Sequence, residues 1–108
     1  MRRGDIVTVS APGDYGTPRP AVVIQSDWLN TTESVLLCLM TSDMRDASFH
    51  RVRVDATTDT GLRQASQIMV DKIVALRRDK CGPPIGRLDH PTIIVLNRTI
   101  ALVTGIAD

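Results

Sequence analysis

The segment GTPRP, residues 16–20, holds one arginine between two prolines, directly before the aliphatic run 21–24. Proline fixes its own φ and restricts the residue before it, so the backbone around Arg19 is stiff. A guanidinium held in this way is well suited to bind a phosphate or a carboxylate through paired hydrogen bonds. An ordinary ion pair of Arg19 with Asp14 or Asp43 at the edge of a strand is the alternative.

Two hydroxyl side chains follow another apolar run. Thr41 and Ser42 come directly after residues 34–40, which are almost all apolar and predict a strand. Their O–H groups can donate to a phosphate, or they can cap the loop that begins there. Both roles stay open at this point.

The chain carries none of the motifs that hold common cofactors. It has no Gly-x-x-x-x-Gly-Lys-Ser/Thr loop, no Gly-x-Gly-x-x-Gly turn and no His or Cys cluster with metal-ligand spacing. No serine has the surroundings of a nucleophile elbow. An enzyme built from this chain is therefore expected to use no cofactor and no metal, and to rely on Arg, Thr, Ser and Asp side chains.

One reaction suits these side chains, namely cleavage of RNA by attack of the substrate's own 2′-OH on the adjacent phosphate. The protein then supplies donors for the charged phosphate, a base near the 2′-OH and an acid near the leaving oxygen. Arg19 is the candidate donor, and Thr41 and Ser42 add hydroxyl contacts.

Further candidates for RNA contacts lie on an alternating segment and beside it. Arg51 and Arg53 alternate with valines, so the arginines are expected to point outward and the valines inward. Outward arginines can extend a track of phosphate contacts, while Phe49 and Tyr15 can stack an unpaired base. Solvated arginines and a packed Phe49 are the alternative.

Periodicity predicts short strands followed by one helix, hence a mainly β fold, a small curled sheet or barrel with a C-terminal α-helix. Cys81-Gly82-Pro83-Pro84 is expected to break the strand pattern. Asp89 is the expected N-cap of a helix over about 90–105, with Pro91 in its first turn. The expected strands cover residues 5–10, 20–24, 34–40, 50–55, 67–70 and 73–77.

Composition favours one small globular domain, residues 1–108, with 43% hydrophobic residues. No run reaches the roughly 18 apolar residues that span a bilayer, and the start lacks a signal sequence, so a cytoplasmic protein with no membrane contact is expected. The net charge of +1 argues against binding nucleic acid by bulk electrostatics alone. Cys38 is expected to be a buried thiol and Cys81 an exposed one. Trp28 is expected to pack at the sheet edge, and a surface that contacts the antitoxin or a second subunit is the alternative.

The chain resembles the MazF/PemK (Kid) toxin family in four segments. Arg3-Gly4-Asp5-Ile6 is similar to the family's R-G-D/E-I, and residues 16–25 are similar to its G-x-R-P with an aliphatic strand. Residues 39–42 are similar to its V-T-S/T strand end. Residues 61–73 are similar to its G-L-x(3–4)-S-x-(V/I)-x-x-D-Q-(I/V) segment. The four segments follow the family's order at workable spacing, and the resemblance covers nearly the whole chain.

This resemblance implies an SH3-like barrel that acts as the toxin of a type II toxin–antitoxin pair. Its implied activity is metal-independent, sequence-specific cleavage of single-stranded RNA that leaves a 2′,3′-cyclic phosphate. The implied partners are a second copy in a homodimer, with RNA across the groove between subunits, and a cognate antitoxin. An acidic C-terminal tail of the antitoxin is expected to lie in the RNA groove.

The resemblance also implies roles for single residues. Arg19 matches the G-x-R-P arginine, which stabilises the phosphate and donates a proton. Because a guanidinium is a poor proton donor, we expect it to act mainly as an electrostatic clamp. Thr41 matches the threonine that contacts the phosphate or the 2′-OH, supported by Ser42. Asp71 matches an aspartate that is proposed as the base.

The chain departs from the family pattern at two places. Asp14 and Tyr15 stand in the loop where PemK-like members carry a histidine, and both are candidates for RNA contacts. Met69 stands where those members carry an arginine. The base is therefore open among Asp71, Asp14 and His50.

Two other functions fit the same fold. CcdB toxins act by inserting a C-terminal Trp-Gly-Ile into gyrase, whereas this chain has Thr104-Gly105-Ile106 followed by two further residues. A small SH3-like binding module without catalytic activity is the third possibility.

Overall fold

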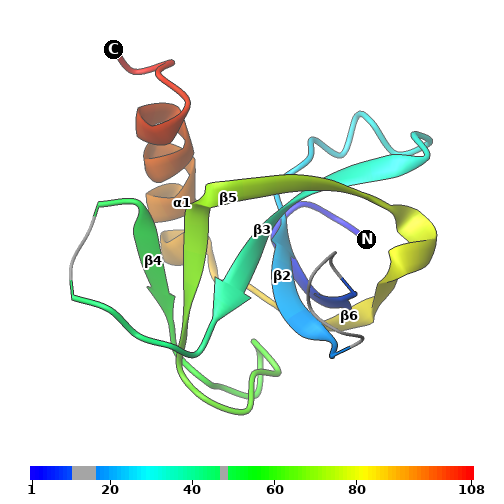
Figure 1. The fold of residues 1–108 in the computed structure, drawn as a ribbon, viewed down its shortest axis with the longest axis horizontal. Helices are drawn as coiled ribbons and strands as arrows, with labels where there is room; N and C mark the ends of the chain where they lie inside the picture. The colour runs from blue at the N-terminus through cyan, green and yellow to red at the C-terminus, as the bar shows by residue number, and fades with distance from the viewer. Residues whose placement is uncertain (11–16, 47–48) are drawn as a thin grey trace.

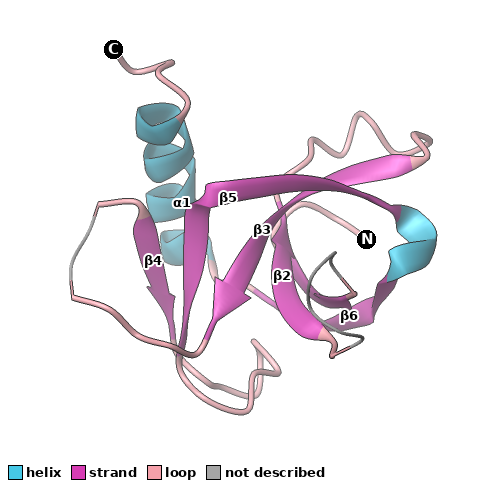
Figure 2. Ribbon diagram, in the orientation of Figure 1, coloured by secondary structure: helices cyan, strands magenta, loops and turns pink. Residues whose placement is uncertain are grey.

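A computed structural model describes residues 1–10, 17–46 and 49–108. Figures 1 and 2 show a strongly bent sheet with the C-terminal helix against it, and a short 3-10 helix, Arg78–Lys80 (η1), between the strands β5 and β6. The six strands are hydrogen-bonded in the order β4-β5-β3-β2-β1-β6. Their bounds are Asp5–Val9 (β1), Arg19–Val23 (β2), Ser34–Thr41 (β3), Arg51–Val54 (β4), Ser66–Arg77 (β5) and Cys81–Arg87 (β6).

The sheet is antiparallel throughout, and it bends where its registers shift. The pairing of β3 with β5 jumps between Cys38 and Met40, and that of β1 with β6 shifts on both sides of Val7. Such irregularities bend a strand and increase its twist. In Figure 1, β5 accordingly runs along β4 and then turns across the molecule toward β6.

The curled sheet is buried on both of its faces, which explains why its central strands are almost wholly apolar. One core cluster faces α1 (His90–Val103) and contains Ile6, Val22, Met40, Ile68 and Leu96. A second cluster lies on the other face, inside the curl, and contains Val7, Ala21, Val23, Leu37 and Leu39.

The mainly β class with a C-terminal helix is confirmed, whereas two sequence-based element boundaries were wrong. The polar pair at 71–72 suggested two short strands, yet β5 is continuous, because these residues lie exposed where the strand bends. Residues 81–84 suggested a break, yet they belong to β6. Proline is tolerated there because β6 is an edge strand, where a missing N–H costs no ladder bond.

The helix begins as the sequence predicts. The Asp89 carboxylate accepts a hydrogen bond from the Thr92 backbone N–H at 2.9 Å, and Pro91 occupies the first turn. Hydrogen bonds from Thr92 lower the pKa of the Asp89 carboxyl. Within the described part of the chain, no helix is both long and apolar enough to span a bilayer.

The residues of the Arg-Gly-Asp segment join β1 to the rest of the sheet. The Asp5 carboxylate accepts from Arg87 Nη1 on β6 at 2.8 Å and from the Arg2 backbone N–H at 2.8 Å. Gly4, at φ 90°, donates its N–H to the Val23 carbonyl at 2.8 Å. Arg3 donates from Nε to the Ile24 carbonyl at 2.9 Å. This segment therefore connects three strands.

Candidate functional site

A cavity of about 710 Å³ opens at the end of the molecule where β2 begins and β3 ends. It lies between these strands, the loop that precedes β5, and parts of β1 and β6. The residues that line it are Thr8, Pro18, Arg19, Pro20, Met40, Thr41, Ser42, Gly61, Leu62, Arg63, Gln64, Ser66 and Ile85. None of these described lining residues is acidic, and two are arginines.

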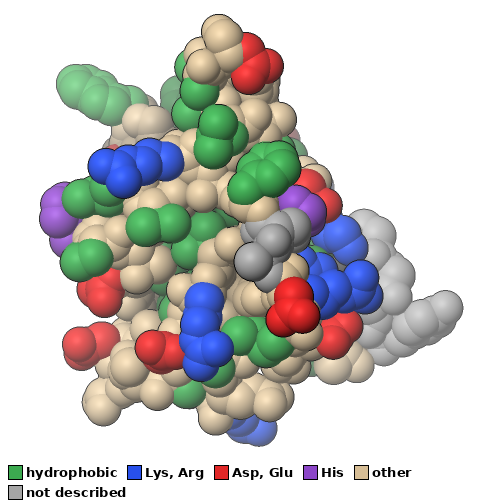
Figure 3. All heavy atoms as spheres, turned by 90° about the vertical axis from the view of Figure 1, so that its left-hand side faces the viewer, with side chains coloured by type: hydrophobic (Ala, Val, Ile, Leu, Met, Phe, Trp, Pro, Cys, Tyr) green, Lys and Arg blue, Asp and Glu red, His purple; other side chains and the backbone are tan. Residues whose placement is uncertain are grey.

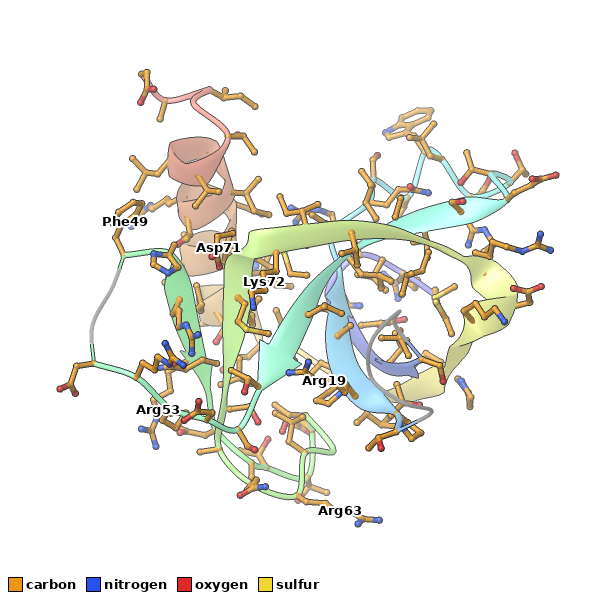
Figure 4. All side chains as sticks on the ribbon, in the orientation of Figure 1. Arg19, Phe49, Arg53, Arg63, Asp71 and Lys72 are labelled. Carbon is orange, nitrogen blue, oxygen red and sulfur yellow. The ribbon has the colours of Figure 1, made fainter. Side chains whose placement is uncertain are left out.

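Arg19 is the first residue of β2 and is half-buried. Its Nη2 donates to the Met40 carbonyl at 3.3 Å, and Figure 4 shows its side chain lying toward the end of β3. The backbone is held between Pro18 and Pro20, as the sequence suggested, and it pairs with Val9 of β1. The guanidinium is thus fixed at the cavity wall rather than directed to bulk solvent.

Thr41 and Ser42 lie beside Arg19 because β3 ends there. The Thr41 hydroxyl oxygen accepts from the Asp43 backbone N–H at 3.0 Å, so the loop-capping role is real. A hydroxyl that accepts one hydrogen bond keeps its own proton to donate, so capping does not exclude a contact to an anion. The structure therefore brings together three of the residues that the sequence singled out.

Arg63 and Gln64 line the same cavity, although the sequence reasoning assigned them no role. They precede β5, and Gln67 of β5 pairs with Thr41 of β3. This pairing of non-consecutive strands brings the loop beside the end of β3. The signal in the sequence is Gly61-Leu62-Arg63, which belongs to a segment that resembles the MazF/PemK family.

Three of the residues that the sequence predicts to contact RNA lie outside the cavity. Arg51 holds the loop after β3, since its Nη1 donates to the Asp43 carbonyl at 3.1 Å and to Gln67 Oε1 at 3.0 Å. Arg53 is exposed and pairs with Asp55 at 3.0 Å. Phe49 is 70% exposed, and its ring meets the His50 ring edge-on, with centroids 5.7 Å apart. Figure 4 shows Phe49 and Arg53 on the β4 side of the molecule, away from Arg19.

Asp71, one of the three candidates for the base, is not among the lining residues either. It lies exposed at the bend of β5, four residues beyond Gln67, which corresponds to roughly 13 Å along a strand. Asp14 and Tyr15 lie outside the described residues. The roles of these three side chains remain predictions.

Apolar side chains gather on the face that carries α1 and the start of β4, as Figure 3 shows. Exposed apolar groups of this kind mark surfaces that meet another chain. The residues concerned are Phe49, Ile94, Val95, Leu102 and Ile106, which are between 38% and 80% exposed.

The chemistry of the cavity is that of an anion site. In the described residues no three His, Cys, Asp or Glu side chains stand close enough to hold a metal ion. The cavity instead presents two guanidinium groups and the hydroxyls of Thr41 and Ser42, which are donors that suit phosphate oxygens.

Fold and cavity together define a small, mainly β protein that offers guanidinium and hydroxyl donors to an anionic ligand. Comparison with known proteins makes the assignment specific. The chain belongs to the PemK-like, MazF-like toxins of type II toxin–antitoxin systems, whose family model matches residues 2–104. It is 38% identical over 108 residues, 99% of each chain, to a probable endoribonuclease MazF of Mycolicibacterium smegmatis.

Solved structures share the fold at lower sequence identity. A mycobacterial endoribonuclease in complex with its cognate antitoxin is 20% identical, with a TM-score of 0.82 over 98% of this chain and 96% of that one. The MazF-mt6 toxin of Mycobacterium tuberculosis is also 20% identical, with a TM-score of 0.81 over 94% and 96%. MazF in a MazE–MazF crystal from Deinococcus radiodurans is 18% identical, with a TM-score of 0.77 over 97% and 95%.

Proposed function

We propose that this chain is a toxin that cleaves single-stranded RNA, with the scissile phosphate bound in the cavity beside Arg19. The observation that carries the proposal is the shared cavity, in which one fixed guanidinium lies beside the hydroxyls of Thr41 and Ser42. The relative at 38% identity is named a probable endoribonuclease, which supports the same reaction.

The proposed reaction uses the substrate's own 2′-OH as nucleophile. Its oxygen attacks the adjacent phosphorus and loses its proton to a base, the bond to the 5′ oxygen breaks, and that oxygen takes up a proton from solvent water. The products are a 2′,3′-cyclic phosphate and a 5′-OH end. Arg19 and the Thr41 hydroxyl stabilise the charge that develops on the phosphate oxygens, which needs no metal ion. Because a guanidinium is a poor proton donor, Arg19 acts mainly as a clamp on the phosphate.

The assignment of Asp71 as base rests on the resemblance alone. Since it lies roughly 13 Å along β5 from the level of Thr41, it can serve this cavity only if another subunit brings it to the RNA. A homodimer with RNA along a groove between the subunits meets that requirement. The exposed apolar side chains over α1 support an association with a further chain.

The second partner that we propose is an antitoxin with an acidic segment. The cavity lining described here has two arginines and no acidic residue, so a carboxylate-rich tail complements its charge. The mycobacterial and Deinococcus structures of the same fold contain an antitoxin, which agrees with this choice. We place both proteins in the cytoplasm, and we treat residues 1–108 as one toxin domain.

The test is cleavage of total RNA by purified protein in the presence of EDTA, with the ends mapped by sequencing. We expect 2′,3′-cyclic phosphate ends at a recurring short sequence. Loss of a fixed donor to the reacting phosphate lowers kcat by about 100- to 1000-fold, so Arg19→Ala is expected to do so. Arg77→Ala removes an exposed arginine that is paired with Asp79 outside the cavity, and it is the matched control.

Three outcomes would count against the proposal. These are cleavage that requires a divalent metal, cleavage that survives Arg19→Ala, and growth arrest accompanied by gyrase-dependent DNA damage with intact RNA. The last outcome would favour the CcdB type of activity. Arg19→Lys refines the result, since it keeps the charge and removes the planar fork.

A further inference from the structure

Arg63 is the second cation of the cavity, and its surroundings differ from those of Arg19. It is exposed, and in the part of the chain that is described here its side chain makes no hydrogen bond or ion pair with a protein group. Figure 4 shows it at the tip of the loop before β5, at the same end of the molecule as Arg19 and extended toward solvent. Its donors are therefore available to a ligand.

The backbone that carries Arg63 is held firmly, although its side chain has no partner among the described residues. The Gly61 N–H donates to the Thr57 carbonyl at 3.0 Å, and the Arg87 N–H on β6 donates to the Asp59 carbonyl at 2.8 Å. Gly61 adopts φ +68°, and a Cβ there would lie 2.0 Å from the Ile85 carbonyl oxygen. The loop therefore packs directly on β6 and offers Arg63 at a fixed place, which lowers the entropic cost of binding.

The charge of the cavity lining also points to an extended anion. Two guanidinium groups share this surface with no carboxylate among the described lining residues, so an anion with more than one charge is favoured there. Single-stranded RNA places one phosphate at every nucleotide. Arg19, half-buried and bonded to the Met40 carbonyl, suits the reacting phosphate, whereas the solvent-exposed Arg63 suits a neighbour.

We propose that Arg63 binds a backbone phosphate that flanks the scissile one, and that it sets the affinity for RNA rather than the rate of the chemical step. This inference rests on the proposed function and adds a binding residue to it. A contact made equally in the ground state and the transition state changes KM and leaves kcat unchanged. Arg63 therefore controls KM, whereas Arg19 controls kcat.

The experiment compares Arg63→Ala, Arg63→Lys and the control Arg77→Ala with the unmodified chain. The substrate is a single-stranded RNA oligonucleotide that contains the mapped cleavage sequence, and Kd is measured with the same oligonucleotide carrying 2′-O-methyl groups throughout. For Arg63→Ala we expect KM and Kd to rise about 5- to 10-fold, with kcat within about twofold. The slope of log Kd against log salt should fall by about 0.7, the value for one phosphate contact on a single strand. Arg63→Lys should keep the slope, and Arg77→Ala should change nothing.

Two results would overturn the inference. One is an unchanged Kd and salt slope in Arg63→Ala. The other is a loss of kcat as large as that of Arg19→Ala, which would make Arg63 part of the chemical step. The proposed function fails separately, when the unmodified chain leaves RNA intact in EDTA. The binding measurement on 2′-O-methyl RNA still decides the role of Arg63 in that case.

Discussion

The ion pair between Asp5 and Arg87 tests whether the Arg-Gly-Asp segment stabilises the fold or takes part in the chemical step. Asp5 begins β1, Arg87 ends β6, and the carboxylate accepts from Arg87 Nη1 at 2.8 Å. Its second oxygen accepts from the Arg2 N–H at 2.8 Å. The Asp5 side chain is 13% exposed and that of Arg87 is 41% exposed. The perturbation is Asp5→Ala, with Arg87→Ala and the double variant to complete a cycle.

The expected magnitude follows from these contacts. A hydrogen bond to a charged group contributes about 1.5–3 kcal/mol, but an ion pair near the surface contributes at most about 1 kcal/mol. Because Arg87 is partly solvated, we expect a coupling free energy of about 1 kcal/mol between the two side chains. Asp5→Ala also removes the acceptor for the Arg2 N–H, so its total cost should be about 2 kcal/mol. For a chain of this length that lowers Tm by roughly 8 °C.

Urea unfolding followed by circular dichroism measures the free energies of the cycle, and thermal unfolding measures the change in Tm. Asp79→Ala, which breaks an exposed pair with Arg77, serves as the control and should cost less than about 0.5 kcal/mol. At temperatures where Asp5→Ala is folded, its kcat for RNA should stay within about twofold. A coupling below about 0.3 kcal/mol, or a collapse of kcat with unchanged stability, would refute the assignment of this segment to the fold rather than to the chemistry.

Further predictions follow from other contacts. Gly86→Ala would place a Cβ 2.2 Å from the Thr60 carbonyl, so it should lower the urea midpoint and weaken RNA binding together; an unchanged midpoint would contradict the packing of this loop on β6. Burial raises the pKa of the Cys38 thiol to about 12, so at neutral pH only one thiol, that of Cys81, should react with Ellman's reagent before unfolding. The pKa of Cys38 in the folded chain exceeds its ordinary value of 9.0, so stability should decline as pH rises from 9.0 toward about 12, and Cys38→Ala should flatten that decline. If Asp71 of one subunit serves Arg19 of another, mixing equal amounts of the inactive Arg19→Ala and Asp71→Asn variants should restore about a quarter of the activity, since about half of all dimers are then mixed and each mixed dimer carries one intact site. No recovery would place both groups in one subunit, and an Asp71→Asn variant that is active by itself would remove Asp71 from the reaction.

The strands were largely predictable because a strand that is buried on both faces is apolar at nearly every position. Residues 21–24 and 34–40 read as buried strands, and they form the centre of the sheet. The continuity of β5 could not be predicted, since an exposed polar pair at a bend resembles a turn in the sequence. The edge strand β6 was missed for a related reason: proline removes a donor, and only the topology shows that no donor was needed at that position.

The candidate site was predictable only in part. Arg19, Thr41 and Ser42 share a cavity, as their predicted contacts to one phosphate require, because β2 and β3 are neighbours in the chain and in the sheet. Arg63 was missed because its position depends on the pairing of β3 with β5, which are neighbours in the sheet although β4 lies between them in the chain.

Trp28 was expected to pack at the sheet edge, yet it is 94% exposed. An aromatic residue carries no local signal that separates a surface position from a buried one. Only the placement of the connection between β2 and β3 decides it, and there the Trp28 backbone N–H donates to the Ser26 hydroxyl oxygen at 3.2 Å within an exposed turn.

The four segments that resemble the MazF/PemK family have two roles: some hold parts of the sheet together, and others supply donors to the cavity. Because both roles are needed, the resemblance extends along the chain. The Arg-Gly-Asp segment joins β1 to β6 through Asp5, and Gly61 presses the loop before β5 onto the same edge strand. The other segments supply donors, Arg19 from the start of β2 and Thr41 from the end of β3. Separate strand ends can be held around one phosphate only if the sheet curls by the required amount. A chain with the Pro-Arg-Pro step alone would offer a stiff guanidinium and no second wall, so the contacts that set the curl are together required to form the cavity that the donors share.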